Sequence, residues 1–235
     1  MNYLYGADRD YTDFASGRAL RGGAGRPNFP ARLALELYGR GAAALDGAEV
    51  RLWDPLCGGG SLLVVAALLG EPAPAAVYGS DADPGAVTLA KENLSLLTPE
   101  GCARRRAQLE ASLQSFGRES FAQALESLAR VAALAQARRV PGEAFVYDIF
   151  SPAPADVSAP PNLVVCDLPY GHLVDWQGAS RDPGAAFLPA LGRWLAPGAV
   201  AVVCMEKRQR LEASGFVRLD KQQVGKRRFE IYRRV

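Results

Sequence analysis

The stretch Asp54-Pro55-Leu56-Cys57-Gly58-Gly59-Gly60 separates two apolar segments, 50–53 and 61–69. The first segment is short and has the composition of a buried strand, whereas the second is long enough to form a helix. Glycines between a strand and a helix let the backbone turn tightly and approach a ligand closely. We therefore predict a strand that ends at Asp54, a ligand-binding loop over 55–60, and a helix over Ser61–Leu69.

Strand and helix signals alternate on both sides of this loop. Continuous apolar strands that alternate with helices indicate a mostly parallel sheet covered on both faces. We predict strands over 50–53, 76–79, 145–148, 162–166, 199–205, 216–220 and 229–235, the last two partly antiparallel, and helices over 29–41, 61–69, 84–97 and 183–195. The sequence thus predicts one Rossmann-like α/β domain, residues 1–235, with a seven-stranded sheet.

Two segments lie outside this alternation. Residues 1–28 are rich in Gly, Arg and Tyr without a clear period, and we expect an irregular lead-in. Residues 99–140 hold two helical stretches, 104–115 and 120–139, where the next strand normally follows within a few residues. This helical insertion either caps the sheet or binds the substrate. We favour substrate binding because the insertion is basic.

Composition excludes several classes of protein. The 235-residue chain is 49% hydrophobic and 22% charged, unlike collagen or a disordered chain. Its longest stretch without Asp, Glu, Lys or Arg has 16 residues, fewer than the about 20 that span a membrane. Residues 1–13 show no secretory signal. Four scattered cysteines argue against a zinc or disulfide framework, so we expect no metal, no membrane and a cytoplasmic protein.

The net charge of +2 hides a segregation of charge along the chain. Residues 101–140 hold seven Arg against three Glu, and residues 200–235 hold ten Lys or Arg against four acids. The rest of the chain is therefore acidic. Two basic segments on an acidic body favour a polyanionic partner, although two solvated faces would have the same composition.

Asp81 follows the next predicted strand, 21 residues after Gly60. An acid at this place accepts hydrogen bonds from the hydroxyls of a ribose. A dinucleotide fingerprint would need a third glycine where Leu63 stands, and the acid Asp54 before the glycines is not a pyrophosphate feature. The motif instead resembles that of S-adenosylmethionine-dependent methyltransferases. The alternative is a tight turn without a ligand.

Asp167-Leu168-Pro169-Tyr170-Gly171 ends the fourth predicted strand. It resembles the (Asp/Asn)-Pro-Pro-(Tyr/Phe) motif of methyltransferases that act on exocyclic amines. Asp167 and the Leu168 carbonyl would accept the amine N–H groups, and Pro169 would fix the turn. Tyr170 would stack on a flipped base, worth roughly 1–3 kcal/mol. We expect these four residues to be catalytic, with Asp167 also beside the cofactor.

Several further residues have two interpretations. Asp148 would accept from the adenine amino group of the cofactor, or it would cap a helix. Asp83 would cap the helix that Pro84 begins. Cys57 belongs to the cofactor loop but more simply packs beneath it. His172, the one histidine, is more simply a loop residue than a general base.

Together these motifs resemble the AviRa family, rRNA guanine methyltransferases that confer avilamycin (orthosomycin) resistance. The resemblance covers most of the chain. It lies in 27–34, 52–60, 80–84 and 90–101, in the insertion at 104–110 and 115–121, and in 167–171 and 176–178. It implies methyl transfer from S-adenosylmethionine to a guanine of the large-subunit rRNA, near the peptidyl-transferase centre. The cofactor residues that we expect from the motifs are Asp54, Pro55, Cys57, Gly58, Gly60, Asp81, Ala82, Asp148 and Asp167.

The basic segments agree with an RNA substrate. Arginine and lysine contacts to phosphates position RNA without reading its sequence. We expect such contacts from Arg104, Arg105, Arg106, Arg118, Lys226, Arg227, Arg228, Arg233 and Arg234. A structured RNA would be recognised by shape, with one base flipped into the site.

Two other functions compete with this one. The Asp167 motif also serves adenine, so a methyltransferase on adenine of DNA or RNA is a second enzymatic possibility. A cofactor-binding RNA-binding module without catalysis is the third. The sequence leaves open the modified nucleotide and nitrogen, the choice between rRNA and a ribosomal precursor particle, and the oligomeric state, for which a monomer is our default.

Overall fold

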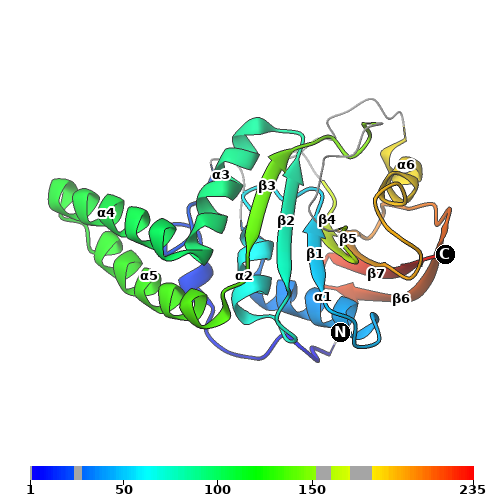
Figure 1. The fold of residues 1–235 in the computed structure, drawn as a ribbon, viewed down its shortest axis with the longest axis horizontal. Helices are drawn as coiled ribbons and strands as arrows, with labels where there is room; N and C mark the ends of the chain where they lie inside the picture. The colour runs from blue at the N-terminus through cyan, green and yellow to red at the C-terminus, as the bar shows by residue number, and fades with distance from the viewer. Residues whose placement is uncertain (1, 24–27, 152–159, 170–181) are drawn as a thin grey trace.

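A single sheet organises the molecule. The computed structural model describes residues 2–23, 28–151, 160–169 and 182–235. Among these residues seven strands pair in the order β3-β2-β1-β4-β5-β7-β6 (Figure 1). They are β1 (Arg51–Asp54), β2 (Ala76–Asp81), β3 (Gly142–Val146), β4 (Leu163–Asp167), β5 (Val200–Glu206), β6 (Phe216–Val224) and β7 (Arg227–Arg234). β1 to β5 are parallel, and β7 runs antiparallel to β5 and β6, which confirms the predicted class.

Alternate residues of the strands enter two separate cores. Leu52 and Val202 pack with α1, α2 and α3, whereas their neighbours Trp53 and Ala201 pack with α6. Both faces of the sheet are therefore covered, as apolar parallel strands require. The helices are α1 (Ala31–Ala43), α2 (Ser61–Leu69), α3 (Pro84–Leu94), α4 (Pro99–Phe116), α5 (Glu119–Arg138) and α6 (Pro183–Leu191), with 3-10 turns η1 (Thr12–Phe14) and η2 (Ser95–Leu97).

The predicted insertion is a helical hairpin. α4 and α5 lie side by side and extend away from the sheet beyond α3 (Figure 1). α4 begins at Pro99, five residues earlier than predicted, because the Thr98 hydroxyl accepts the Gly101 N–H at 3.1 Å and caps the helix. α5 buries Leu128 and Val131 in the core shared with α1 and α2. The base of the hairpin is therefore packed on the domain.

The lead-in is more ordered than the sequence suggested. Phe14, Ala19 and Leu20 are buried in the main core. Glu36 of α1, also fully buried, accepts the backbone N–H groups of Leu4, Tyr5 and Gly6 at 2.8, 2.7 and 3.0 Å. One carboxylate thus satisfies three amides that have no place in a helix or sheet. The described part of the lead-in is therefore packed into the fold.

Other predicted boundaries were also wrong, including the ends of α6 at Leu191 and of β6 at Val224. Gly39 and Gly41 were expected to end the first helix, but α1 continues to Ala43. A Cβ on Gly39 would lie 2.3 Å from Tyr5 Cγ, and one on Gly41 would lie 2.5 Å from Leu163 Cδ1. Both glycines therefore allow close packing. The strand predicted over 145–148 is β3, Gly142–Val146, because it pairs with β2 from Val77 onward.

Candidate active site

Three carboxylates stand at one edge of the sheet. Asp81, Asp54 and Asp167 are the last residues of β2, β1 and β4, which are neighbours in the sheet. Parallel strands carry their carboxyl ends to the same edge, where open α/β sheets bind ligands. The structure therefore brings the acids of all three sequence motifs together.

The glycine loop has the conformation that its composition predicts. Gly58 and Gly60 have φ of +50° and +72°, values that favour glycine. A Cβ on Gly58 would meet no atom within 4 Å, so the loop is open there, whereas one on Gly60 would lie 3.3 Å from Ala90 Cα. Gly60 thus permits close packing on α3, and Gly58 leaves room for a ligand. Cys57 is buried beneath the loop and faces Gly79.

Asp81 joins this loop to the start of α3. Its two carboxylate oxygens accept the N–H groups of Gly58 at 2.9 Å and of Asp83 at 3.0 Å. Each oxygen retains a lone pair for a further donor, such as a ribose hydroxyl. The next residue, Ala82, is half-buried at the same edge. Asp83 accepts the Gly85 N–H at 2.7 Å and caps α3, as predicted.

Asp54 is the most buried of the three acids, and Pro55 beside it is buried too. Burial raises the pKa of Asp54 well above its usual value, although the Leu56 N–H opposes this at 3.1 Å. The charges of Asp81 and Asp167 raise the pKa further. This acidic edge and the open space at Gly58 fit a cationic nucleoside, and S-adenosylmethionine is one.

The Asp167 carboxylate can accept a further hydrogen bond. Its Oδ1 is buried without a hydrogen-bond partner among the described nitrogen and oxygen atoms. Burial raises the pKa of Asp167 to about 6, against the lowering effects of the Arg227 charge and the Cys204 thiol. The Cys204 thiol is only a weak hydrogen-bond donor, so the carboxylate keeps capacity for a stronger one. The carboxylate is therefore an acceptor site ready for a ligand N–H.

Arg227, which we expected to contact RNA phosphate, lies at this acidic edge beside Asp167. Its Nη2 is 3.7 Å from Asp167 Oδ2, and its guanidinium lies over the Phe29 ring at 5.4 Å from the centroid. The Phe29 N–H in turn donates to Ser61 Oγ at 3.0 Å. Phe29, just after the lead-in, thus holds a cation beside the predicted catalytic acid. The sequence offered no signal for this, because the three residues are far apart in the chain.

The residues after Asp167 are only partly described. The Leu168 N–H donates to the Cys204 carbonyl at 2.9 Å, which anchors the residue whose carbonyl is the predicted acceptor. The Pro169 carbonyl accepts from Gln209 Nε2 at 2.8 Å. Gln209 was not predicted, because the sequence around it contains no motif typical of an active site. Tyr170, His172 and Trp176 lie outside the described residues, so their roles stay predictions.

Asp148 lies two residues beyond β3 rather than at its end. Its Oδ1 accepts the Phe150 N–H at 2.9 Å, a local turn bond. The side chain is half-buried. Its contact with an adenine amino group stays a prediction.

Asn93 is a buried residue that the motifs did not indicate. Its Nδ2 donates to the Gly59 carbonyl at 2.8 Å and to the Arg21 carbonyl at 3.2 Å, and its Oδ1 accepts the Arg21 N–H at 2.8 Å. One amide of α3 therefore ties the glycine loop to the lead-in. The sequence shows only an ordinary polar residue within a helix.

The predicted RNA-binding residues fall into two groups. Arg104, Arg106, Arg118 and Lys226 are exposed. Four others instead hold the chain's own carbonyls, which the charge pattern could not reveal: Arg105 bonds Ala19 and Arg18, Arg228 bonds Lys207 and Gln209, Arg233 bonds Ala44, and Arg234 bonds Gly215. These bonds orient the four side chains, and their contacts with RNA phosphates stay predictions.

The described residues show neither a metal-binding cluster nor a membrane span. No group of three or more His, Cys, Asp or Glu side chains there has the geometry to hold a metal ion. No described helix combines the length and apolar character that a membrane span needs.

Comparison with known proteins agrees with the resemblance in the sequence. Residues 1–227 match the family model described as rRNA methyltransferase AviRa. A 23S rRNA (guanine(2535)-N(1))-methyltransferase of Streptomyces viridochromogenes is 32% identical over 233 residues, which is 96% of this chain and 93% of that protein. The named target of that relative is a ring nitrogen, whereas the Asp167 motif suggested an exocyclic amine.

Solved structures agree as well. The rRNA methyltransferase aviRa from Streptomyces viridochromogenes superposes with a TM-score of 0.88 at 33% identity, covering 99% of this chain and 96% of that one. A putative RNA methyltransferase from Pyrococcus horikoshii, 13% identical with a TM-score of 0.53 over 93% of this chain and 92% of its own, shares the fold. The seven-stranded sheet, the acidic edge and the full-length match together show that this chain belongs to the AviRa family of rRNA methyltransferases.

Proposed function

We propose that this protein transfers a methyl group from S-adenosylmethionine to N1 of a guanine in 23S rRNA. Membership of an rRNA methyltransferase family supports the reaction class, and the relative named for guanine N1 supports the base and the atom. One observation in this chain carries the proposal furthest. It is the pairing of Asp167 with Arg227, whose Oδ2 and Nη2 atoms are 3.7 Å apart at the acidic edge.

This pair complements the Watson–Crick edge of guanine. That edge presents N–H donors at N1 and at the 2-amino group, and an acceptor at O6. The Asp167 carboxylate accepts from N1–H, the Leu168 carbonyl accepts from the 2-amino group, and the Arg227 guanidinium donates to O6. Adenine has an acceptor at N1 and a donor at its 6-amino group. In the same position, adenine would place its N1 acceptor against the Asp167 carboxylate and its 6-amino donor against the Arg227 guanidinium. The adenine alternative is therefore disfavoured.

The same pair suits the chemistry at a ring nitrogen. N1 of guanine carries a proton, and the electron pair of that N–H bond becomes the pair that bonds the methyl carbon. Asp167 takes the proton, and its pKa of about 6 leaves it ionised at neutral pH. Charge that collects on O6 as the proton leaves faces the Arg227 cation. Asp167 is thus the base, and Arg227 stabilises the charge.

The cofactor would be held by the residues of the glycine loop and the acidic edge. When bound, S-adenosylmethionine supplies an electrophilic methyl group on a cationic sulfur. Asp81 would accept from the ribose, Gly58 leaves the loop open for the ligand, and the negative edge with Asp54 favours a cation. Much of the rate would come from the alignment of N1 with that methyl group.

The first experiment measures tritiated methyl transfer from S-adenosylmethionine to unmodified 23S rRNA, with tRNA and DNA as parallel acceptors. We expect label in 23S rRNA and 1-methylguanosine after nuclease digestion and mass spectrometry. Asp167→Asn should abolish transfer, and Arg227→Gln should lower kcat about 100-fold or more. Lys226→Gln, which removes an exposed neighbouring charge, serves as the matched control and should alter mainly KM.

Specific outcomes would contradict the proposal. N2-methylguanosine as product would show that the exocyclic amine is the acceptor. Inosine at the mapped position keeps N1–H and O6 but lacks the 2-amino group, so it should remain a substrate. Loss of methylation on inosine would point the same way as N2-methylguanosine. RNA binding without transfer to rRNA or to a precursor particle would favour the non-catalytic module.

The biological setting follows from the same proposal. We place the reaction in the cytoplasm, on large-subunit rRNA or a precursor particle. Orthosomycin resistance is the expected consequence, and a sensitive host that expresses the wild-type protein should survive avilamycin. The same host with Asp167→Asn should not survive.

A further inference from the structure

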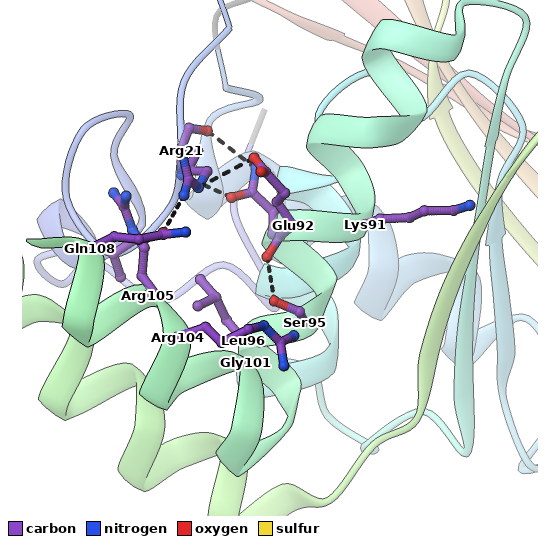
Figure 2. Close-up of a pocket in the computed structure, with 11 residues that line it drawn as sticks. Arg21, Lys91, Glu92, Ser95, Leu96, Gly101, Arg104, Arg105 and Gln108 are labelled. Atoms are coloured by element: carbon purple, nitrogen blue, oxygen red, sulfur yellow. Dashed lines mark hydrogen bonds and ion pairs between the residues drawn. The ribbon is translucent and has the colours of Figure 1, made fainter.

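A basic pocket lies between the lead-in, the end of α3 and the start of α4. Its volume is about 260 Å³. Figure 2 shows Arg21 of the lead-in beside Glu92 of α3 and Gln108 of α4, while Arg104 extends from α4 toward Ser95. Arg105 of α4 also lines the pocket. Lys91 belongs to the rim, but its side chain points away from this cluster (Figure 2). The pocket is separate from the acidic edge that holds the candidate active site.

Positive charge in the pocket exceeds negative charge. Three arginines and one carboxylate line the pocket, and Glu92 pairs with Arg21 at 3.3 Å. Burial lowers the pKa of Arg105, and the charge of Arg21 lowers it further. The protein therefore holds like charges close together and only partly neutralised. An arrangement of this kind attracts an anion.

Two of the guanidinium groups are oriented in advance. Arg105 donates to the carbonyls of Ala19 at 3.2 Å and of Arg18 at 3.4 Å. Arg21 bonds Gln108 as well as Glu92 (Figure 2). A guanidinium has five N–H donors, so each group retains donors for a ligand. An anion that binds there would lose little free energy in ordering these side chains.

The pocket is joined to the cofactor loop by one residue. Asn93 bonds the backbone of Arg21 on one side and the Gly59 carbonyl on the other, and its side chain is fully buried. The pocket therefore has a constant position relative to the loop. A group bound in it would help to set where the rest of a long substrate lies.

We propose that this pocket binds a phosphodiester group of the RNA substrate, away from the nucleotide that is methylated. The proposal rests on the proposed function, in which the substrate is RNA. Guanidinium forks match phosphate oxygens. The lining residues include no Phe, Tyr or Trp, so the pocket offers no ring on which a base could stack.

The test compares two opposite charge changes. Affinity for an unmodified 23S rRNA transcript is measured by filter binding across a range of salt concentrations. Arg104→Ala removes one exposed cation of the pocket and should weaken binding roughly 3–10-fold and lower the salt slope by about one. Glu92→Gln removes the one carboxylate and should tighten binding several-fold.

The matched controls are two exposed residues that do not line the pocket. Arg139 and Glu143 are exposed beside the start of β3, and Arg139→Ala and Glu143→Gln alter the net charge by the same amounts. Both control variants should leave the affinity for the 23S rRNA transcript, and its dependence on salt concentration, near the wild-type values. Binding of S-adenosylhomocysteine by calorimetry verifies that each variant is folded.

Each outcome separates the two proposals. If the pocket variants behave like their controls while the wild type methylates rRNA, the pocket proposal is overturned alone. If the pocket variants alter RNA affinity but no methyl group is transferred, the pocket stands and the proposed function fails. Inorganic phosphate is the second probe. If it binds the pocket while all four variants bind RNA alike, the site takes a free anion and the RNA assignment is overturned.

Discussion

The side-chain amide of Asn93 donates a 2.8 Å hydrogen bond to the Gly59 carbonyl and is itself fully buried. The same side chain pairs with both backbone groups of Arg21. One residue therefore supports the cofactor loop from below and anchors the lead-in beside it.

Asn93→Ala should impair both functions of that residue. It leaves the Gly59 and Arg21 groups without partners, so we expect a loss of about 2–3 kcal/mol in the free energy of unfolding. Affinity for S-adenosylhomocysteine should fall several-fold because the loop is released. Urea unfolding and calorimetry measure the two effects. Ser95→Ala, near the same end of α3, is the control. Unchanged cofactor affinity would mean that other contacts position the loop.

Gly58→Ala should separate cofactor binding from stability. The φ of +50° makes alanine strained, at a cost of about 1 kcal/mol. The added methyl group would also occupy the open space at the loop and lower S-adenosylhomocysteine affinity about tenfold or more. Gly117→Ala, with φ of +61° and open space at the end of α4, should cost similar stability without affecting affinity. Equal affinities in the two variants would disprove the placement of the cofactor.

The pH dependence of kcat/KM should report the ionisation of Asp167. Its pKa is about 6, and the base must be ionised to accept the proton. We expect the rate to rise through this range and level off above it. Because the Arg227 charge lowers the pKa, Arg227→Gln should move the acid limb to higher pH, whereas Lys226→Gln should not. A flat profile between about pH 5 and 8 would exclude Asp167 as the base.

Asp167→Asn should raise stability while it abolishes activity. The folded pKa of about 6 exceeds the usual 3.8, so the folded state binds the proton more tightly than the unfolded state. Stability of the wild type therefore falls as pH rises through this window. Above about pH 6 the amide variant should be more stable by up to about 3 kcal/mol, and below about pH 4 the difference should vanish. Thermal unfolding across pH measures this, and a less stable variant at pH 7 would contradict it.

Glu36→Gln should loosen the lead-in. Burial raises the pKa of Glu36, but hydrogen bonds from Gly6, Tyr5, Arg40 and Leu4 outweigh it and hold the pKa below the usual 4.5. The carboxylate thus stabilises the fold above that pH, and this contribution is lost as pH falls through the lowered pKa.

We expect the Gln variant to lose about 2 kcal/mol at neutral pH and to approach the wild type in acid. Denaturant unfolding at several pH values measures it. Glu49→Gln, which removes an exposed acid, is the control. Equal losses in the two variants would contradict a special role for Glu36.

Local sequence signals predicted helices and strands best where neighbouring residues in the chain determine the backbone conformation. α2 begins at Ser61 and ends at Leu69 as expected, since glycines flank a continuous apolar run. Gly39 and Gly41 indicated the wrong end for the first helix, because a glycine that ends a helix and one that admits a neighbouring side chain look alike in sequence. Only the contacts with Tyr5 and Leu163 distinguish them.

The sequence by itself determined the fold class, the acidic strand ends and the glycine loop. These depend on residue type and on spacing along one strand and the turn that follows it. Tertiary structure alone decided which charged groups meet. It placed Arg227 against Asp167, turned Arg105 and Arg228 toward the chain's own carbonyls, and buried Asn93 between two distant segments. The physical reason is that charge and hydrogen bonding act over a few ångströms in space, and sequence separation carries almost no information about such distances.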